Sequence, residues 1–201
     1  MKHIKPYKIF ESTSPNFPTT KEEVIEVCER HRIKNYTIND DLSIDVDGNV
    51  DLSSRNLEYL PLRFNYIEGS FDCSNNELKT LEGCPQTVGG DFDCYSNELK
   101  SLEGSPKTVG VDFYCYKNEL KDLEHFPEVS GTIDIEDNIV YCLVYTFINK
   151  ADSFIIEDFT DYEIVRNRDT VMLDRLQTFI RDNDLEMPDL EEIKKEYKII
   201  E

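Results

Sequence analysis

A 21-residue repeat limits the possible folds of this chain more than any other feature of its sequence. Shifting the sequence by that period aligns FDCSNNELKTLEGCP (71–85) with FDCYSNELKSLEGSP (92–106) and FYCYKNELKDLEHFP (113–127). A unit of this length cannot bury its own apolar side chains, so neighbouring copies must stack into a solenoid that shares one core. The repeated columns are Phe71, Phe92 and Phe113; Cys73, Cys94 and Cys115; Asn76, Asn97 and Asn118; Leu78, Leu99 and Leu120; and Leu81, Leu102 and Leu123.

Two degenerate copies, VDLSSRNLEYLP (50–61) and IDIEDNIVYCL (133–143), bring the total to about five coils over residues 50–143. The pattern apolar-x-apolar-x-x-Asn-x-Leu-x-x-Leu resembles the leucine-rich repeat. The repeat length and the Pro after the last Leu are similar to the short bacterial type, whose convex side is extended. The sequence pattern LEG-x-P-x-T-V-G-x-D-F-x-C-x-x-N-E-L is similar to the repeats of leucine-rich repeat proteins of large tailed bacteriophages. The resemblance implies an α+β solenoid with about five parallel strands on a concave face.

Within a coil, the alternation of a short strand predicts that Phe71 and Cys73 point into the core. The same alternation predicts that Asp72 and Ser74 point to solvent. Asn76 and its equivalents then turn the chain, and we expect their side chains to bond backbone groups of neighbouring coils. Tight returns are expected at Gly83, Gly89, Gly90, Gly104 and Gly110.

Residues 19–49 are predicted to form an N-terminal cap made of a helix and a hairpin. Thr20 and Glu23 have the spacing of a capping box, and a helical stripe follows at Val24, Val27, Cys28 and His31. The segment LSIDVDGNVDLS alternates on both sides of Asp47, Gly48 and Asn49, which predicts a hairpin leading into the first coil. Residues 1–18, which contain three prolines, are predicted to be an extended arm.

Residues 144–201 are predicted to form a C-terminal helical cap. TVMLDRLQTFIRDN has a helical stripe, with Asp169 or Thr170 as the N-cap and Asn183 near the end, and its members are Met172, Leu173, Leu176, Phe179 and Ile180. A last helix is expected after Pro188, with Leu190, Ile193 and Tyr197 on its inner face. A further helix is expected around 154–159, opened by Asp152 or Ser153.

The six cysteines could form three disulfides in a secreted protein, but three of them share one inward repeat position. That placement indicates free thiols that serve as small hydrophobes in a reducing compartment. The alternative is a stacked thiol metal site, since equivalent residues in adjacent coils lie about 4.8 Å apart. No histidine accompanies the column, so we expect no metal and no cofactor.

No arrangement of residues indicates catalysis. The segment DVDGNVDLSSRN (45–56) resembles a calcium loop but has Val50 where the motif needs Gly and Asn56 where it needs Glu. His3, His31 and His125 fall in no catalytic motif, and no cysteine has the Cys-x-Asp context of bacterial ubiquitin ligases with similar repeats. We therefore expect no enzyme and no catalytic residue.

Charge and hydropathy bear on partners and location. The chain carries 42 acidic and 22 basic residues, a net charge of −20 that repels nucleic acid backbones. It has no apolar run long enough to span a membrane, and MKHIKPYKIF lacks the apolar segment of a secretory signal. We therefore expect a protein partner, no direct nucleic acid binding, no membrane association and a cytoplasmic location, in the host cytoplasm if the gene belongs to a phage.

The outward strand positions make up the candidate partner-binding surface. We call this surface the acidic-tyrosine face, and its members are Asp72, Asp93, Tyr95, Asp112, Tyr114, Tyr116, Asp134 and Glu136. Tyrosine is a frequent anchor of interfaces because it offers apolar area and a hydroxyl at low entropic cost. The alternative is that tyrosine pairs stabilise the sheet, by about 0.2 to 1 kcal/mol each.

The expected function is that of a non-enzymatic module that binds a partner protein through the concave acidic and tyrosine-bearing face. The phage resemblance implies a protein that inhibits or modulates a host factor, such as a defence factor. The alternatives are an acidic mimic that blocks a DNA- or RNA-binding protein, a virion-associated structural protein, and an enzyme within the C-terminal lobe.

Overall fold

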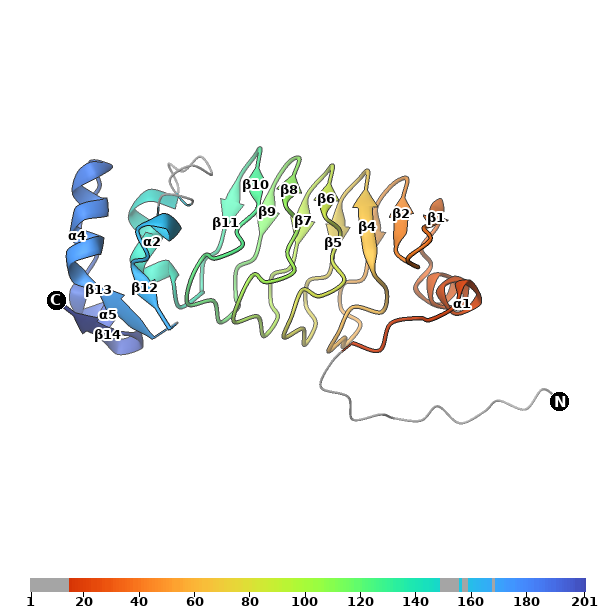
Figure 1. The fold of residues 1–201 in the computed structure, drawn as a ribbon, viewed down its shortest axis with the longest axis horizontal. Coiled ribbons are helices and arrows are strands. Elements are labelled where there is room, and N and C mark those ends of the chain that lie inside the picture. The colour runs from red at the N-terminus through yellow and green to blue at the C-terminus, as the bar shows by residue number, and fades with distance from the viewer. Residues whose placement is uncertain (1–14, 149–155, 157–158, 168) are drawn as a thin grey trace.

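The computed structural model describes residues 15–148, 156, 159–167 and 169–201, which form a parallel β-solenoid followed by a small C-terminal lobe (Figure 1). From the first to the last strand of its five-stranded sheet, the solenoid completes about four turns. Its coils lie side by side in a nearly straight row along the long axis of the view, and helix α1 (Lys21–His31) lies at the N-terminal end.

Each coil contributes one short strand to each of two sheets. The six-stranded sheet has the order β1 (Tyr36–Ile38), β2 (Ile44–Val46), β4 (Phe64–Ile67), β6 (Thr87–Val88), β8 (Thr108–Val109) and β10 (Glu128–Val129). The five-stranded sheet has the order β11 (Ile133–Asp134), β9 (Phe113–Tyr114), β7 (Phe92–Asp93), β5 (Phe71–Asp72) and β3 (Val50–Asp51). All neighbours are parallel except β1 and β2. The five-stranded sheet is the one expected from the repeat, and the other sheet is built by the extended returns.

The core lies between the two sheets and follows the repeat columns. Phe71, Phe92 and Phe113 are fully buried, and their rings stack with centroids 5.8 Å apart from one coil to the next. The cysteine column and the two leucine columns are buried as well. The expected inward positions of Phe71 and Cys73 are therefore confirmed.

Four asparagines, which we call the Asn ladder, follow the strands of the five-stranded sheet: Asn76, Asn97, Asn118 and Asn138. Asn97 shows the pattern: its Nδ2 donates to the carbonyls of Cys73 (3.1 Å) and Cys94 (3.0 Å), and its Oδ1 accepts from the Leu78 N–H (3.0 Å). The Asn97 side chain thus bonds its own coil and the preceding one. The role expected for this column is confirmed.

A second ladder, which we call the corner ladder, lies at the corner before each of these strands and consists of Asn49, Ser70, Asp91 and Asp112. In each member, a side-chain oxygen accepts a backbone N–H of the next coil. The four donors and their distances are Ser70 (2.9 Å), Asp91 (3.0 Å), Asp112 (3.1 Å) and Thr132 (2.6 Å). This ladder was not among the predicted repeat columns.

The glycines beside the corner ladder are required by close approach of neighbouring coils. A Cβ on Gly110 would collide with the carbonyl oxygen of Gly89, and a Cβ on Gly89 would collide with that of Glu68. Gly83 and Gly104 have a different reason, since they adopt φ values of +96° and +87° at the opposite returns. The tight returns expected at these positions are present.

Helix α1 begins as expected at its N-cap, Thr20, whose Oγ1 accepts the Glu23 N–H (3.2 Å). The Glu23 carboxylate accepts from the N–H of Thr19 (2.7 Å), one residue before the position that a capping box would use. Val24 and Cys28 are buried against the first coil. Residues 1–14 of the expected arm lie outside the described residues. Phe17, also assigned to the arm, is instead buried, with the Arg63 guanidinium 4.4 Å from its ring centroid.

The hairpin predicted around Asp47, Gly48 and Asn49 is wrong. Strands β2 and β3 on its two sides belong to different sheets, so this turn is the corner of the first coil. Val46 and Val50 are both buried between the sheets, which a pairing of β2 with β3 would not achieve. Alternation fits a hairpin and a solenoid corner equally well, and burial decides between them.

The C-terminal lobe combines helices with a small sheet. Its elements are α2 (Tyr141–Ile148), β12 (Val165–Arg166), β13 (Thr170–Met172), α4 (Leu173–Asp182), α5 (Leu190–Glu196) and β14 (Lys198–Ile200), with the sheet order β12-β13-β14. The Tyr197 hydroxyl donates to the Lys121 carbonyl (2.8 Å) and so docks the lobe on the solenoid.

One predicted helix start in this lobe is wrong. Residues 170–172 form strand β13, so Asp169 and Thr170 are not the N-cap, and α4 begins only at Leu173. The β-branched pair Thr170 and Val171 favours a strand, and both residues are buried there. The end at Asn183 and the last helix after Pro188 are confirmed. The helix expected around 154–159 lies mostly outside the described residues.

Candidate binding face

Two outward rows of the five-stranded sheet carry most of the acidic-tyrosine face. The first row is in register across the strands and contains Asp51, Asp72, Asp93, Tyr114 and Asp134. The second row lies two residues later and contains Ser53, Ser74, Tyr95, Tyr116 and Glu136. Since adjacent strands lie about 4.8 Å apart, neighbours within a row are close enough to interact. Seven of the eight candidate residues lie in these rows, and Asp112 belongs to the corner ladder.

Ser74 departs from the expected pattern because it is fully buried. Its N–H donates to Asp72 Oδ1 (2.9 Å), and its Oγ accepts from Asn75 Nδ2 (3.2 Å). These bonds draw the short Ser74 side chain in against its neighbours, which alternation alone does not reveal. The prediction that Ser74 faces solvent was therefore wrong.

Tyr95 and Tyr116 form an aromatic stack at the centre of the second row. Their ring centroids are 4.5 Å apart and the planes differ by 4°. The Lys117 ammonium lies 5.8 Å from the Tyr116 ring centroid. Burial, followed by the neighbouring Tyr95 and Asp134, raises the pKa of Tyr116, so its hydroxyl is a neutral donor at physiological pH. The stack offers a flat apolar surface with polar ends.

Asp112 is committed to structure. Its Oδ1 accepts the Thr132 N–H (2.6 Å) and its Oδ2 accepts the Tyr114 hydroxyl (3.0 Å). These hydrogen bonds hold the pKa of the Asp112 carboxyl below its usual value. The bond between Asp112 and the Tyr114 hydroxyl also raises the pKa of Tyr114. Asp112 therefore joins the face to the corner ladder and orients Tyr114.

Asp93 differs from the other aspartates of its row. Asp51, Asp72 and Asp134 each accept the backbone N–H two residues later, at 2.9, 2.9 and 3.0 Å. Within the described part of the chain, no hydrogen bond reaches the Asp93 carboxylate. Burial, followed by the negative charges of Asp72, Asp91 and Asp112, raises the pKa of Asp93 to about 6. At neutral pH this half-buried carboxylate is ionised at an energetic cost.

The face continues toward the C-terminal lobe. Tyr141, the first residue of α2, has its pKa raised by burial and then by the charges of Glu136 and Asp134. Glu136 and Asp134 therefore lie near Tyr141, and acidic and aromatic groups alternate up to the start of the lobe.

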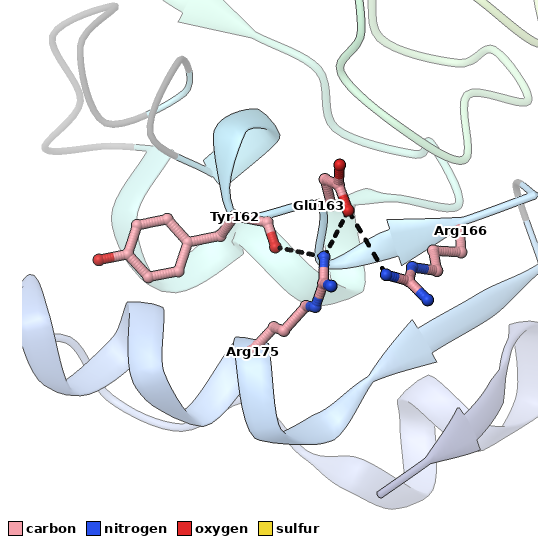
Figure 2. Close-up of polar contacts among 4 residues, drawn as sticks. All are labelled: Tyr162, Glu163, Arg166 and Arg175. Atoms are coloured by element: carbon pink, nitrogen blue, oxygen red, sulfur yellow. Dashed lines mark hydrogen bonds and ion pairs between the residues drawn. The ribbon is translucent and has the colours of Figure 1, made fainter.

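A cavity of about 270 Å³ lies between the last coil and the lobe, with Asp122, Leu123, Phe159, Ile164 and Arg166 among its lining residues. Figure 2 shows the ion-pair cluster at its edge: Arg175 Nη1 donates to Glu163 Oε2 (2.6 Å) and to the Tyr162 carbonyl (3.3 Å), and Arg166 Nη2 lies 3.5 Å from Glu163 Oε2. The two guanidinium groups lower the pKa of Glu163. The cluster ties α4 to β12, which is a structural role.

All six cysteines lie within the described residues and are free thiols, as expected. Burial and the neighbouring Cys115 thiol raise the pKa of Cys94, which makes this thiol unreactive. Across residues 15–148 and the described parts of the lobe, no three His, Cys, Asp or Glu side chains converge to hold a metal ion. The described helices include none that is both long and apolar enough to cross a lipid bilayer.

The calcium-like segment does not converge on one point. Asp45 Oδ1 accepts from Asn65 Nδ2 (2.7 Å) and Asp51 Oδ1 accepts from Ser53, while Asn49 belongs to the corner ladder. The carboxylate and amide side chains of this segment therefore bond different neighbours.

Comparison of the chain with protein-family models, with curated proteins and with solved structures gave no match.

The corner ladder and the lack of a hydrogen bond to the Asp93 carboxylate were not predicted from the sequence. The first had a visible signal, because Asn49, Ser70, Asp91 and Asp112 recur at intervals of 21 residues and all carry a side-chain oxygen close to the backbone. The isolation of Asp93 had no signal, because Asp72 and Asp93 occupy the same repeat position.

Proposed function

We propose that this chain is a non-enzymatic binding protein that holds a partner protein on the acidic-tyrosine face. The observation that carries the proposal is the Tyr95–Tyr116 stack beside the half-buried Asp93 carboxylate. Tyrosines of this kind are common anchors of interfaces, and an ionised group kept without a hydrogen-bond partner is typical of functional sites. A purely structural face would be expected to give Asp93 the same turn bond as its row neighbours.

The repeat pattern supports assigning the coils to a short leucine-rich repeat of the bacterial type. Its similarity to sequences of large tailed bacteriophages supports a partner in the host cytoplasm, such as a defence factor that the protein inhibits or modulates. Association with the virion is the alternative within the same proposal, because it uses the same kind of surface.

A second candidate is a nucleic acid mimic, which the in-register row of Asp51, Asp72 and Asp93 favours. Such a row would occupy the basic groove of a DNA- or RNA-binding protein. Its binding would depend mainly on charge and would be lost as the salt concentration rises.

Capture of partners from the source cell tests the proposal, with parallel washes at low and high salt. The double variant Tyr95→Ala/Tyr116→Ala is compared with Tyr66→Ala, which removes an exposed tyrosine from the six-stranded sheet. We expect a partner that remains bound at high salt to the wild type and to Tyr66→Ala and that is lost by the double variant. Titration calorimetry with the purified partner then measures the loss.

The opposite results are equally specific. Partners released by salt from all three proteins would support mimicry. Equal retention by the double variant, with its fold verified by circular dichroism, would exclude the acidic-tyrosine face as the binding site.

A further inference from the structure

The chemistry around Asp93 indicates what kind of group a partner would place there. The carboxylates of Asp72, Asp91 and Asp112 act electrostatically on Asp93, so an approaching cation would be attracted and an anion repelled. Asp72 already accepts the Ser74 N–H, and both oxygens of Asp112 accept hydrogen bonds. Asp91 accepts the Asp112 N–H through Oδ1. Among the described residues, Asp93 is thus the member of this group whose two carboxylate oxygens both accept no hydrogen bond within the chain.

The stack beside Asp93 narrows the choice of cation. Tyr95 follows Asp93 by two residues on the same side of the strand, a distance of about 6.6 Å along the backbone. A planar guanidinium can donate two parallel hydrogen bonds to a carboxylate while its plane lies on an aromatic ring. An ammonium group is a compact point charge and cannot do both.

Charge complementarity favours a basic segment over other occupants. The chain has a net charge of −20, and the face adds Asp134 and Glu136 beyond the stack. Lys117 lies at the stack, with its ammonium 5.8 Å from the Tyr116 ring centroid, and among the described residues no cation lies over the Tyr95 ring.

We infer that the partner places an arginine-bearing loop or strand on this face, with one guanidinium bonded to Asp93 and stacked on Tyr95. This inference rests on the proposed function and specifies the chemistry of the partner. It assigns Asp93 the role of a specificity residue and the tyrosine stack the role of an anchor.

Two labelled peptides of equal length test the inference, one alternating arginine with glycine and the other alternating lysine with glycine. Their affinities for the full chain are measured by fluorescence anisotropy. We expect the arginine peptide to bind about tenfold more tightly than the lysine peptide, because only arginine combines the bidentate bond with stacking. Asp93→Asn is expected to weaken the arginine peptide about tenfold and the lysine peptide less.

The matched control is Glu103→Gln, which removes the same charge from an exposed return loop outside the face. We expect it to change either affinity by less than about twofold, since exposed charges at a distance are screened. Equal binding of the two peptides, or equal effects of Asp93→Asn and Glu103→Gln, would mean attraction to bulk charge and would overturn the inference.

The inference and the proposed function can fail separately. If the captured partner needs Tyr95 and Tyr116 but binds Asp93→Asn as tightly as the wild type, the face is a binding site and the arginine inference is wrong. Misfolding does not confuse the result, because Asn has the shape of Asp and removes an unfavourable charge. A melting curve of Asp93→Asn verifies this point.

Discussion

The Asn ladder and the corner ladder both satisfy backbone hydrogen-bonding groups between neighbouring coils, but they do so with different residues. The corner ladder lies before the strands of the five-stranded sheet and the Asn ladder lies after them. Both bond backbone groups of a neighbouring coil. Members of the Asn ladder both donate and accept, as Asn97 does, and they are buried. Members of the corner ladder only accept across the coil boundary, and they are Asn, Ser or Asp. The number of bonds that a side chain must make therefore sets how far its identity can vary.

The largest expected effect comes from the Asn ladder. Asn97→Leu keeps the branched shape of the side chain but leaves the Leu78 N–H buried without its acceptor. The Cys73 and Cys94 carbonyls each lose one amide donor and keep another, from Asn76 and Asn118 respectively. The unsatisfied donor costs about 1 to 3 kcal/mol and each lost hydrogen bond to a carbonyl about 1 kcal/mol, so we expect a loss of about 3 kcal/mol in the free energy of unfolding, measured in urea. A loss below about 1 kcal/mol would mean that water replaces the amide, and the contrast between the ladders would disappear.

The glycines beside the corner ladder should give the next largest effect. Gly110→Ala would drive its Cβ into the Gly89 carbonyl oxygen, and we expect it to cost about 2 kcal/mol. The control is Gly48→Ala, whose Cβ would meet nothing within 4 Å and whose φ is +129°. This control should cost only the conformational strain, about 1 kcal/mol. Thermal melting of both variants separates collision from strain. Gly110→Ala should melt at a lower temperature than Gly48→Ala, and the opposite order would contradict the prediction.

Asp93 differs from the ladder residues, because removing its charge should stabilise the protein, whereas removing a ladder side chain should destabilise it. Its pKa of about 6 in the folded state lies above the ordinary 3.8, so the folded state binds more protons between these pH values. The stability that protonated Asp93 contributes is complete below the lower value and is lost as the pH rises through about 6. Allowing for partial exposure, Asp93→Asn should add about 1 to 2 kcal/mol at neutral pH.

The measurement for Asp93 is the urea midpoint as a function of pH. The gain from Asp93→Asn should shrink as the pH falls from neutral to acid, because the wild-type carboxyl becomes protonated. A gain that does not change with pH would show that the cost of charge at Asp93 is not its cause.

The smallest effects are expected in the corner ladder itself. Asp91→Asn keeps an oxygen for the Asp112 N–H, and we expect the stability to change by less than about 0.5 kcal/mol. Asp91→Ala removes the acceptor and should cost about 1 kcal/mol. Equal stability of the two variants, measured side by side in urea, would show that water serves as well as the side chain.

The sequence predicted the parts of the fold that repeat and missed parts that depend on three-dimensional competition. Columns of Phe, Cys, Leu and Asn fixed the core and one sheet because identical residues recur at one interval. Strands of two residues, such as Thr87–Val88, are too short to show periodicity. For this reason the sequence predicted only an extended return where the six-stranded sheet lies. Thr170–Met172 fits both the helical stripe and a strand, and pairing with β14 decides the outcome.

The candidate face shows the same division. Tyr95, Tyr114 and Tyr116 were found from alternation, because an outward position depends only on local strand geometry. The burial of Ser74 and the isolation of Asp93 depend on the size and bonding of residues in the next coil, which alternation does not contain.

Both ladders join only adjacent coils, which makes the length of the solenoid adjustable in whole units. A second copy of residues 92–112 inserted after the first would find the same ladder partners on both sides. The insertion would lengthen the molecule by one strand spacing, about 4.8 Å, and would extend the tyrosine stack to three rings. Growth by duplication of a gene segment would therefore enlarge the recognition surface without a new fold having to evolve.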